Sequence, residues 1–179
     1  MRRAITLIAT AAVLCPLLYL SSLTGADIEV INVESFGYCC IHKKAPFSEI
    51  ETAINELWQT MQRQQIMPTG TMFGVYYNIP DEVQPEDLEW EIAFPVSNVN
   101  PQAPLQAKVW NFNTVAKTVH TGPYEKTGET YAKVFEWMEK NGYEKSGPVL
   151  ERYLTMPGPD ADPQAMKAEI WVPVKKQQL

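Results

Sequence analysis

Three glutamates and three aromatic residues recur at alternating positions of segments rich in strand-forming residues. These side chains are Tyr76, Tyr153, Trp171, Glu91, Glu151 and Glu169. Aromatic rings attract cations through their negative faces, and ligand pockets combine apolar walls with a few convergent polar groups. Around one cleft, these six side chains would bind a small hydrophobic organic molecule that carries positive charge.

The strands that carry them are expected at residues 71–77, 88–96, 148–154 and 167–174. Successive side chains of a strand point to opposite faces. The apolar alternation from Leu88 to Val96 should therefore pack on a helix and leave Glu91 on the other face. The same rule places Glu169 and Trp171 away from a helix.

The two remaining strands require the same choice of face. Phe73, Val75 and Tyr77 are expected to point toward the helix. The far face would then collect Tyr76 with Glu151 and Tyr153, so that all six side chains share one face. The alternative is an ordinary solvated outer face with incidental aromatic residues, because antiparallel sheets often expose one face.

Two amphipathic helices are expected to cover the apolar faces. Ser48 and Glu51 form a possible capping box at the start of the first helix. Its apolar residues follow at helical spacing and are Ile50, Ile54, Leu57, Trp58 and Met61. The second helix carries Tyr131, Val134, Phe135 and Met138 and ends at Gly142. Strands at 36–41 and 115–120 precede the two helices.

An internal repeat organises these elements. Residues 91–96 (EIAFPV) recur as 169–174 (EIWVPV), and residues 70–76 (GTMFGVY) match 147–153 (GPVLERY). Pro46-Phe47 matches Pro123-Tyr124, and His42 matches His120. We therefore predict an α+β fold of two strand–helix–strand–strand modules, at about 27–97 and 105–179. Two antiparallel sheets with helices on the outside would enclose a ligand cleft at a pseudo-twofold axis.

The first 26 residues are expected to be a signal peptide or membrane anchor. Arg2 and Arg3 precede an uncharged stretch from residue 4 to residue 26, and Thr24-Gly25-Ala26 offers small residues for cleavage before Asp27. The folded part, residues 27–179, would then be exported, to the periplasm of a bacterium or beyond. Contact with a membrane is expected only through residues 4–23, if they are retained.

Charge and cysteine content exclude several classes of protein. The net charge of -6 argues against a nucleic-acid partner, which needs a basic face. Cys39 and Cys40 are adjacent, a poor geometry for a disulfide on a strand. We expect one of them to be buried and the other to be a surface thiol. No cofactor and no cysteine-based metal site is expected.

Several segments resemble GyrI-like proteins, a family that includes the effector-binding domains of AraC- and MerR-type regulators. In the first half they are residues 74–82 (GVYYNIPDE) and 88–92 (LEWEI). In the second half they are residues 120–124 (HTGPY), 142–143, 147–148, 151–153 (ERY) and 169–174. The resemblance runs from about residue 28 to residue 174. It implies two pseudosymmetric modules around a cleft for organic, often cationic, molecules.

By the same resemblance, a glutamate on the last strand receives the charge of the ligand. In this chain that residue is Glu169, and Tyr76, Tyr153 and Trp171 would stack on the ligand. The chain lacks the helix-turn-helix of the regulators in the family. A stand-alone binding or sequestering protein is therefore expected rather than a protein that reads DNA.

Two alternatives stay open. Some stand-alone members of the family resemble hydrolases of reactive electrophilic molecules, and Glu169 as base with Tyr76 or Tyr153 as acid would be the corresponding pair. The SOUL haem-binding family is similar in fold, and there His42 or His120 would be the axial ligand of a tetrapyrrole.

Overall fold

The computed structural model describes residues 28–80, 82–155 and 161–177. In the first half of the chain, strand β2 (Phe36–Lys44) leads into helix α1 (Ile50–Arg63), and strands β3 (Phe73–Tyr76) and β4 (Glu89–Pro95) follow. In the second half, β6 (Thr114–Thr121) leads into α2 (Thr127–Lys140), and β8 (Val149–Tyr153) and β9 (Lys167–Lys176) follow. The predicted α+β class and the order of elements in each half are confirmed.

Three further strands were not predicted from the sequence. They are β1 (Glu29–Asn32), β5 (Gln106–Trp110) and β7 (Tyr143–Lys145). Although β1 precedes the first half, it pairs with β6 of the second half. In the same way β5 precedes the second half but pairs with β2 of the first. Each half thus receives an edge strand from the segment that leads into the other half.

The expected pair of sheets is one continuous antiparallel sheet. Its strand order is β1-β6-β9-β8-β3-β4-β2-β5, and β7 extends it by pairing with β9. The two halves meet where β3 pairs with β8. We call this junction the seam. Because one strand of each half is hydrogen-bonded there, residues of both halves lie next to one another at the seam.

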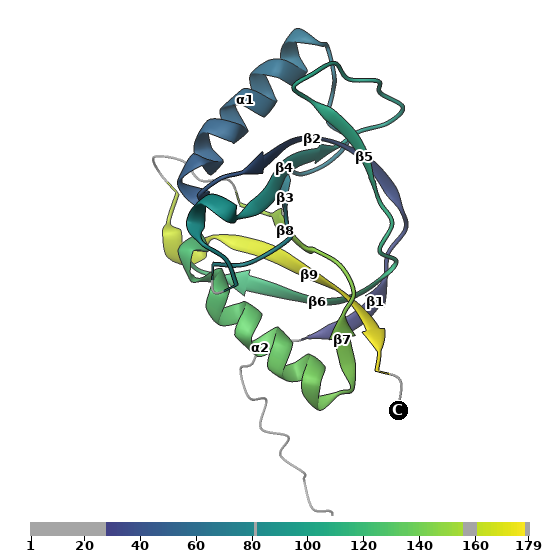
Figure 1. Ribbon diagram of the computed structural model, residues 1–179, viewed down its shortest axis with the longest axis vertical. Helices are drawn as coiled ribbons and strands as arrows, with labels where there is room; N and C mark the ends of the chain where they lie inside the picture. Colours follow the sequence, from purple (N-terminus) through teal and green to yellow (C-terminus); the bar gives the residue numbers. More distant parts are fainter. Residues whose placement is uncertain (1–27, 81, 156–160, 178–179) are drawn as a thin grey trace, which may run out of the picture.

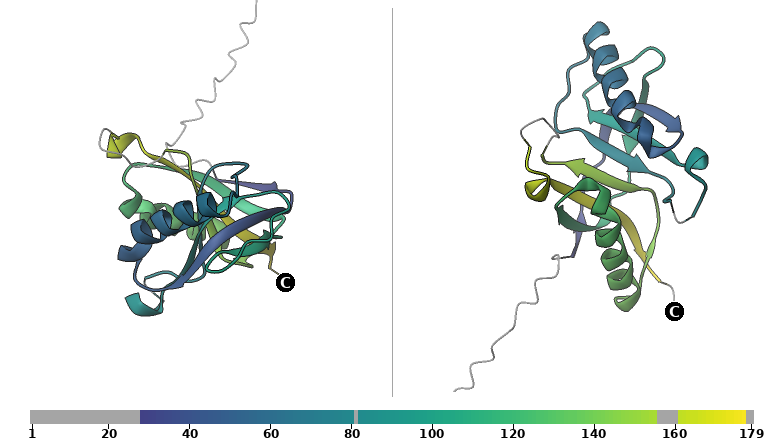
Figure 2. Two further views of the ribbon diagram at one scale, coloured as in Figure 1. Left: turned by 90° about the horizontal axis from the view of Figure 1, so that it is seen from above. Right: turned by 90° about the vertical axis from the view of Figure 1, so that its left-hand side faces the viewer.

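Both helices lie on the same side of the sheet (Figure 1, Figure 2). Helix α1 buries Ala53, Leu57 and Met61, and α2 buries Val134 and Met138. These residues are spaced by four, so they form one stripe along each helix. The stripes pack on the apolar alternation of β4 and β9, including Trp90, Ile92, Ile170 and Val172. The helix-facing sides predicted for these two strands are confirmed.

The side of the sheet away from the helices is also buried. The sheet curls on this side, and the backbone amide of Val33 donates to the carbonyl of Asn113 at 2.8 Å to join the segments after β1 and β5. An apolar cluster that includes Tyr38, Phe73 and Trp171 fills the curl. Neither face of the central strands is therefore an open, solvated surface.

This double burial corrects the predicted orientation of β3 and β8. Tyr76 lies directly opposite Trp90 and shares the helix side with it, whereas Phe73 and Val75 lie inside the curl. In β8, Tyr153 lies on the helix side and Leu150 inside the curl. All four residues of β3 are buried, so its sequence has no polar face to mark which side is which.

Two smaller predictions are also wrong. The chain enters α1 through a 3-10 turn, Phe47–Glu49, and no side chain caps the helix, so the Ser48–Glu51 capping box does not form. Cys39 and Cys40 are both buried free thiols, one beneath α1 and the other inside the curl. The expected surface thiol is wrong, because both faces of β2 are covered.

The predicted leader, residues 1–26, lies outside the described residues. Within the described part of the chain, no helix has both the length and the apolar character that a membrane span requires.

Candidate functional site

Glu151 occupies the centre of the seam. It lies directly opposite Gly74 in the pairing of β8 with β3. These two positions are also equivalent in the sequence repeat, which aligns residues 70–76 with 147–153. A twofold axis that relates the two halves would therefore pass between them. The position carries a carboxylate in one half and no side chain in the other.

Tyrosine hydroxyls surround this carboxylate on the helix side of the sheet. Tyr131 of α2 donates a hydrogen bond to Glu151. Tyr76 and Tyr153, which are equivalent in the repeat, share a hydrogen bond between their hydroxyls across the seam. A Cβ atom on Gly74 would lie 2.8 Å from Cε2 and Oη of Tyr76. Glycine at this position is therefore what lets the Tyr76 ring lie against the strand beside Glu151.

Two further aromatic rings extend this wall. Phe47, at the turn before α1, packs edge-on against Tyr76 with ring centroids 5.5 Å apart. Tyr124, at the equivalent turn before α2, lies 5.2 Å from the ring of Tyr153. The two halves thus contribute matching pairs of rings, which meet at the hydrogen bond between Tyr76 and Tyr153. We call Glu151, Tyr76, Tyr153, Tyr131, Phe47 and Tyr124 the seam cluster.

Within the described part of the chain, the charge of Glu151 has no counter-charge. The residue is only 5% exposed, and no cationic side chain among the described residues forms an ion pair with it. Burial raises the pKa of Glu151 to about 7, although hydrogen bonds from Tyr131, Thr127 and Tyr153 act in the opposite direction. Neutral hydroxyls satisfy the carboxylate oxygens but do not neutralise the charge.

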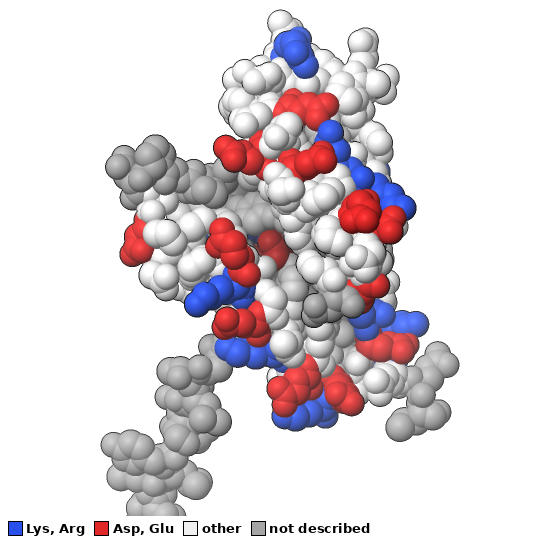
Figure 3. Space-filling model, turned by 60° about the vertical axis from the view of Figure 1, so that its left-hand side comes forward, with Lys and Arg blue, Asp and Glu red and all other residues white. Residues whose placement is uncertain are grey.

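The molecular surface is hollowed on the helix side. Figure 3 shows a recess between the upper and lower parts of the molecule, with acidic atoms visible inside it. Ligand sites of proteins are typically concave, with apolar walls and few polar groups. The seam cluster, which lies on this side of the sheet, supplies aromatic and polar side chains of the kind that line such sites.

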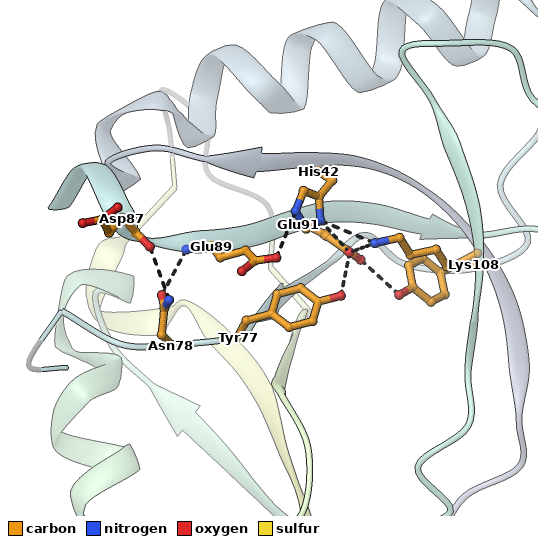
Figure 4. A network of polar contacts seen from close by, with 8 residues as sticks. His42, Tyr77, Asn78, Asp87, Glu89, Glu91 and Lys108 are labelled. Atoms are coloured by element: carbon orange, nitrogen blue, oxygen red, sulfur yellow. Dashed lines mark hydrogen bonds and ion pairs between the residues drawn. The ribbon is translucent and has the colours of Figure 1, made fainter. Parts of the chain in front are cut away.

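Glu91, by contrast, is saturated with donors. This fully buried carboxylate accepts hydrogen bonds from Tyr38 at 3.0 Å, from Tyr77 at 2.7 Å and from His42 at 3.0 Å. Lys108 of β5 forms an ion pair with it (Figure 4). Burial alone would raise the pKa of Glu91, but hydrogen bonds from Lys108, His42 and Tyr77 outweigh it and lower the pKa. This network stabilises the sheet and leaves no free charge for a ligand.

Glu169 is also neutralised within the protein. Its carboxylate lies 3.1 Å from the ammonium of Lys117 and 3.1 Å from the guanidinium of Arg152. The same guanidinium covers the ring of Trp171 at 5.3 Å. Glu169 and Trp171 point away from the helices, as predicted. The residue that the family resemblance favours as the partner of the ligand's charge therefore already has two cationic partners within the protein.

The six predicted residues therefore separate into two groups. Tyr76, Tyr153 and Glu151 meet on the helix side at the seam, whereas Glu91, Glu169 and Trp171 lie on the other side of the sheet. The predicted catalytic pairing of Glu169 with Tyr76 or Tyr153 is ruled out by this separation. Sequence reasoning missed Tyr131, Phe47 and Tyr124. The repeat did align Phe47 with Tyr124, which was the available signal.

Both histidines use both ring nitrogens. His42 contacts Glu91 through Nδ1 at 3.0 Å and Glu89 through Nε2 at 3.2 Å. His120 contacts the Thr130 hydroxyl through Nδ1 at 2.8 Å and the Pro123 carbonyl through Nε2 at 3.1 Å. These contacts fix the two rings in the fold, and ligation of a haem iron would require one of them to break.

Two pockets lie away from the seam. One, of about 400 Å³, surrounds the end of α1 and is lined by uncharged side chains such as Gln64 and Asn100. The other, of about 380 Å³, lies beside β5 between Tyr77 and Trp110, and its one charged residue is Lys108. Because Lys108 is paired with Glu91, neither pocket offers the buried, uncompensated charge of the seam.

Comparison with solved structures shows relatives of the same fold. The chain is 19% identical to EcmrR in a complex with DNA, with a TM-score of 0.74 over 84% of this chain and 57% of that chain. It is 14% identical to a Listeria innocua hydrolase encoded by lin2189, with a TM-score of 0.65 over 84% and 92%. It is 18% identical to SAV2435 bound to tetraphenylphosphonium, with a TM-score of 0.54 over 83% and 94%.

The chain thus spans little more than half of the EcmrR chain. The sequence matches no curated protein. The family model for the GyrI-like small molecule binding domain matches residues 26–175. This range contains both helices and all described strands except the last residue of β9. The chain therefore belongs to the family of GyrI-like small-molecule-binding domains.

Proposed function

We propose that this protein binds a small, hydrophobic organic cation at the seam, with Glu151 as the counter-charge and the rings of the seam cluster as the wall. The observation that carries the proposal is a buried carboxylate without a cationic partner among the described residues, enclosed by aromatic side chains. SAV2435, which has the same fold, has been solved with tetraphenylphosphonium, a molecule of this chemical class.

The energetics favour a cationic ligand at this position. Two unit charges about 4 Å apart attract each other by about 4 kcal/mol at an effective dielectric constant of roughly 20. The desolvation of Glu151 has already occurred in the folded protein, so a cation that enters does not cause it again. Rings of Tyr76 and Tyr153 beside the carboxylate add cation–π attraction. A neutral molecule of the same shape gains only the apolar contacts.

The test is calorimetric titration of the folded protein with tetraphenylphosphonium at pH 8, where Glu151 is ionised. Glu151→Gln keeps the size of the side chain and removes its charge. We expect the Kd to rise by about 10- to 100-fold, since a hydrogen-bonding or ionic partner of a charged group contributes about 1.5–3 kcal/mol.

Glu169→Gln is the matched control, because it makes the same chemical change on the other side of the sheet. We expect it to leave the Kd within about twofold of the wild type, and Trp171→Phe to do the same. A loss of affinity in Glu169→Gln with none in Glu151→Gln would reject the seam and support the residue that the family resemblance favours.

A hydrolase is the second candidate. A carboxyl group with a pKa near 7 is suited to general acid–base catalysis at neutral pH, and Tyr153 is close enough to Glu151 to affect its pKa. The test is incubation with a panel of epoxides, with hydration products detected by mass spectrometry. Products formed by the wild type but not by Glu151→Gln would favour catalysis over binding alone. The predicted export to an extracytoplasmic compartment stays a prediction.

A further inference from the structure

We propose that the seam exchanges a proton for its cation, so that Glu151 holds a proton in the free protein at and below neutral pH and releases it when the ligand binds. This inference rests on the proposed function and adds to it the regulation of the same site by pH.

Neutral side chains surround the carboxylate of Glu151. Each packed element presents a neutral group to it. Strands β3 and β8 contribute Tyr76 and Tyr153, α2 contributes Thr127 and Tyr131, and the turn before α2 contributes Tyr124. Strand β9 pairs with Glu151 through Ile170. An ionised Glu151 would therefore be a buried net charge among neutral partners, which is costly.

The titratable and charged groups nearby do not change this balance. His120 of β6 is on the helix side, and its ring is held by Thr130 and Pro123. Arg152, the neighbour of Glu151 on β8, bonds Glu169 on the opposite side of the sheet. The other charged side chains of α2 and of the turn before it, such as Lys126, Glu129 and Lys133, are exposed, and so is Lys167 at the start of β9.

The other two strand glutamates show what the seam lacks. Glu91 and Glu169 are equivalent in the repeat and lie at the centre of their halves, and each has a lysine within its own fold. At the seam the compensating positive charge has to come from outside the described residues. Either a proton or an organic cation can supply this charge. The two compete, because a protonated carboxyl group is neutral and no longer attracts the cation.

The exchange balances in atoms and charge. The free site holds a neutral carboxylic acid whose O–H proton leaves to solvent as the cation enters. The bound site holds a carboxylate and a monovalent cation, so the net charge of the buried site stays zero in both states. The raised pKa of Glu151, about 7, puts this exchange within the physiological range.

Tetraphenylphosphonium is a suitable probe because its own charge does not depend on pH. With a carboxyl pKa near 7, the ionised fraction falls from about nine-tenths at pH 8 to about one-tenth at pH 6, so affinity should fall by about tenfold. Titrations at pH 6 in two buffers of different ionisation enthalpy should report release of about 0.9 proton per ligand, and at pH 8 of about 0.1. Triphenylphosphine oxide, a neutral analogue, should not bind more tightly as pH rises.

Two variants locate the proton. Glu151→Gln should bind with no proton release and with equal affinity at pH 6 and pH 8. Tyr131→Phe removes a hydroxyl that lowers the pKa of Glu151, so the pH dependence should move upward while the release persists. This second variant keeps the inference testable if the first one folds poorly.

The outcomes separate the two proposals. Binding by the wild type without proton release, and with equal affinity at both pH values, would overturn the exchange and leave cation binding intact. Proton release that survives in Glu151→Gln would assign the proton to another group and also overturn the inference. If the wild type does not bind at pH 6 or at pH 8, the proposed function itself is overturned.

Discussion

Replacing Glu151 by glutamine also measures the free energy of holding a charge at the seam without any ligand. The pKa of this carboxyl rises from an ordinary value of 4.5 to about 7 in the folded protein, a difference of about 2.5 units. Each unit corresponds to about 1.4 kcal/mol. At pH 8, the ionised carboxylate therefore destabilises the fold by up to about 3 kcal/mol.

The sign of the effect follows from proton linkage. The folded state binds the proton more tightly than the unfolded state, so the contribution of this group to stability is greatest below pH 4.5. It is lost as pH rises from 4.5 through about 7 and stays lost above that. The direction is opposite to that of a glutamate held in an ion pair, whose stabilising contribution is lost in acid.

Urea denaturation of the wild type and of Glu151→Gln at pH 5 and pH 8 tests this reasoning. The free energy of unfolding of the variant relative to that of the wild type should rise by about 2.5 kcal/mol between the two pH values, with the variant the more stable at pH 8. Glu169→Gln, which removes a carboxylate from two ion pairs, should not gain stability at pH 8. A difference between wild type and Glu151→Gln that is the same at both pH values would refute the assignment of an uncompensated charge to the seam.

Two other substitutions test the local geometry. Gly74→Ala should destabilise the protein by about 1–3 kcal/mol, because its Cβ would meet the Tyr76 ring at 2.8 Å. In thermal melts, the double variant with Tyr76→Ala should recover part of this loss. Glu91→Gln should lower the free energy of unfolding by about 1–3 kcal/mol at pH 7, because it leaves Lys108 without its carboxylate partner. Denaturation measured at pH 7 and pH 4 should show this loss shrinking as pH falls below 4.5.

The sequence predicts the strands well where their two faces differ in polarity. Segment 88–96 alternates large apolar residues with Glu89 and Glu91, and the structure places Trp90 and Ile92 beneath α1 as expected. Strand β3 carries no such contrast, because Phe73, Gly74, Val75 and Tyr76 are all buried. A strand covered on both sides reads the same in either orientation, so alternation alone could not place Tyr76.

The charge balance of the glutamates depends on contacts that are distant in sequence. Lys108 reaches Glu91 from β5, a strand that was not predicted from the sequence. This strand leads into the second half of the chain but pairs with β2 of the first half. Lys117 reaches Glu169 from the neighbouring strand β6. Composition and spacing show that three glutamates are present on strands, but only strand pairing shows which of them are already neutralised. This is why Glu169 looked the strongest from sequence and Glu151 is the strongest from structure.

The repeat is most informative where it breaks. Tyr76 and Tyr153 preserve it, whereas Gly74 and Glu151, directly opposite each other at the seam, do not. A glutamate at both positions would place like charges face to face on adjacent strands, which destabilises a sheet. It would also remove the space into which the Tyr76 ring folds. One glutamate and one glycine leave the seam with a single negative charge and an asymmetric aromatic wall. The proposed exchange of a monovalent cation for a proton depends on that single carboxylate.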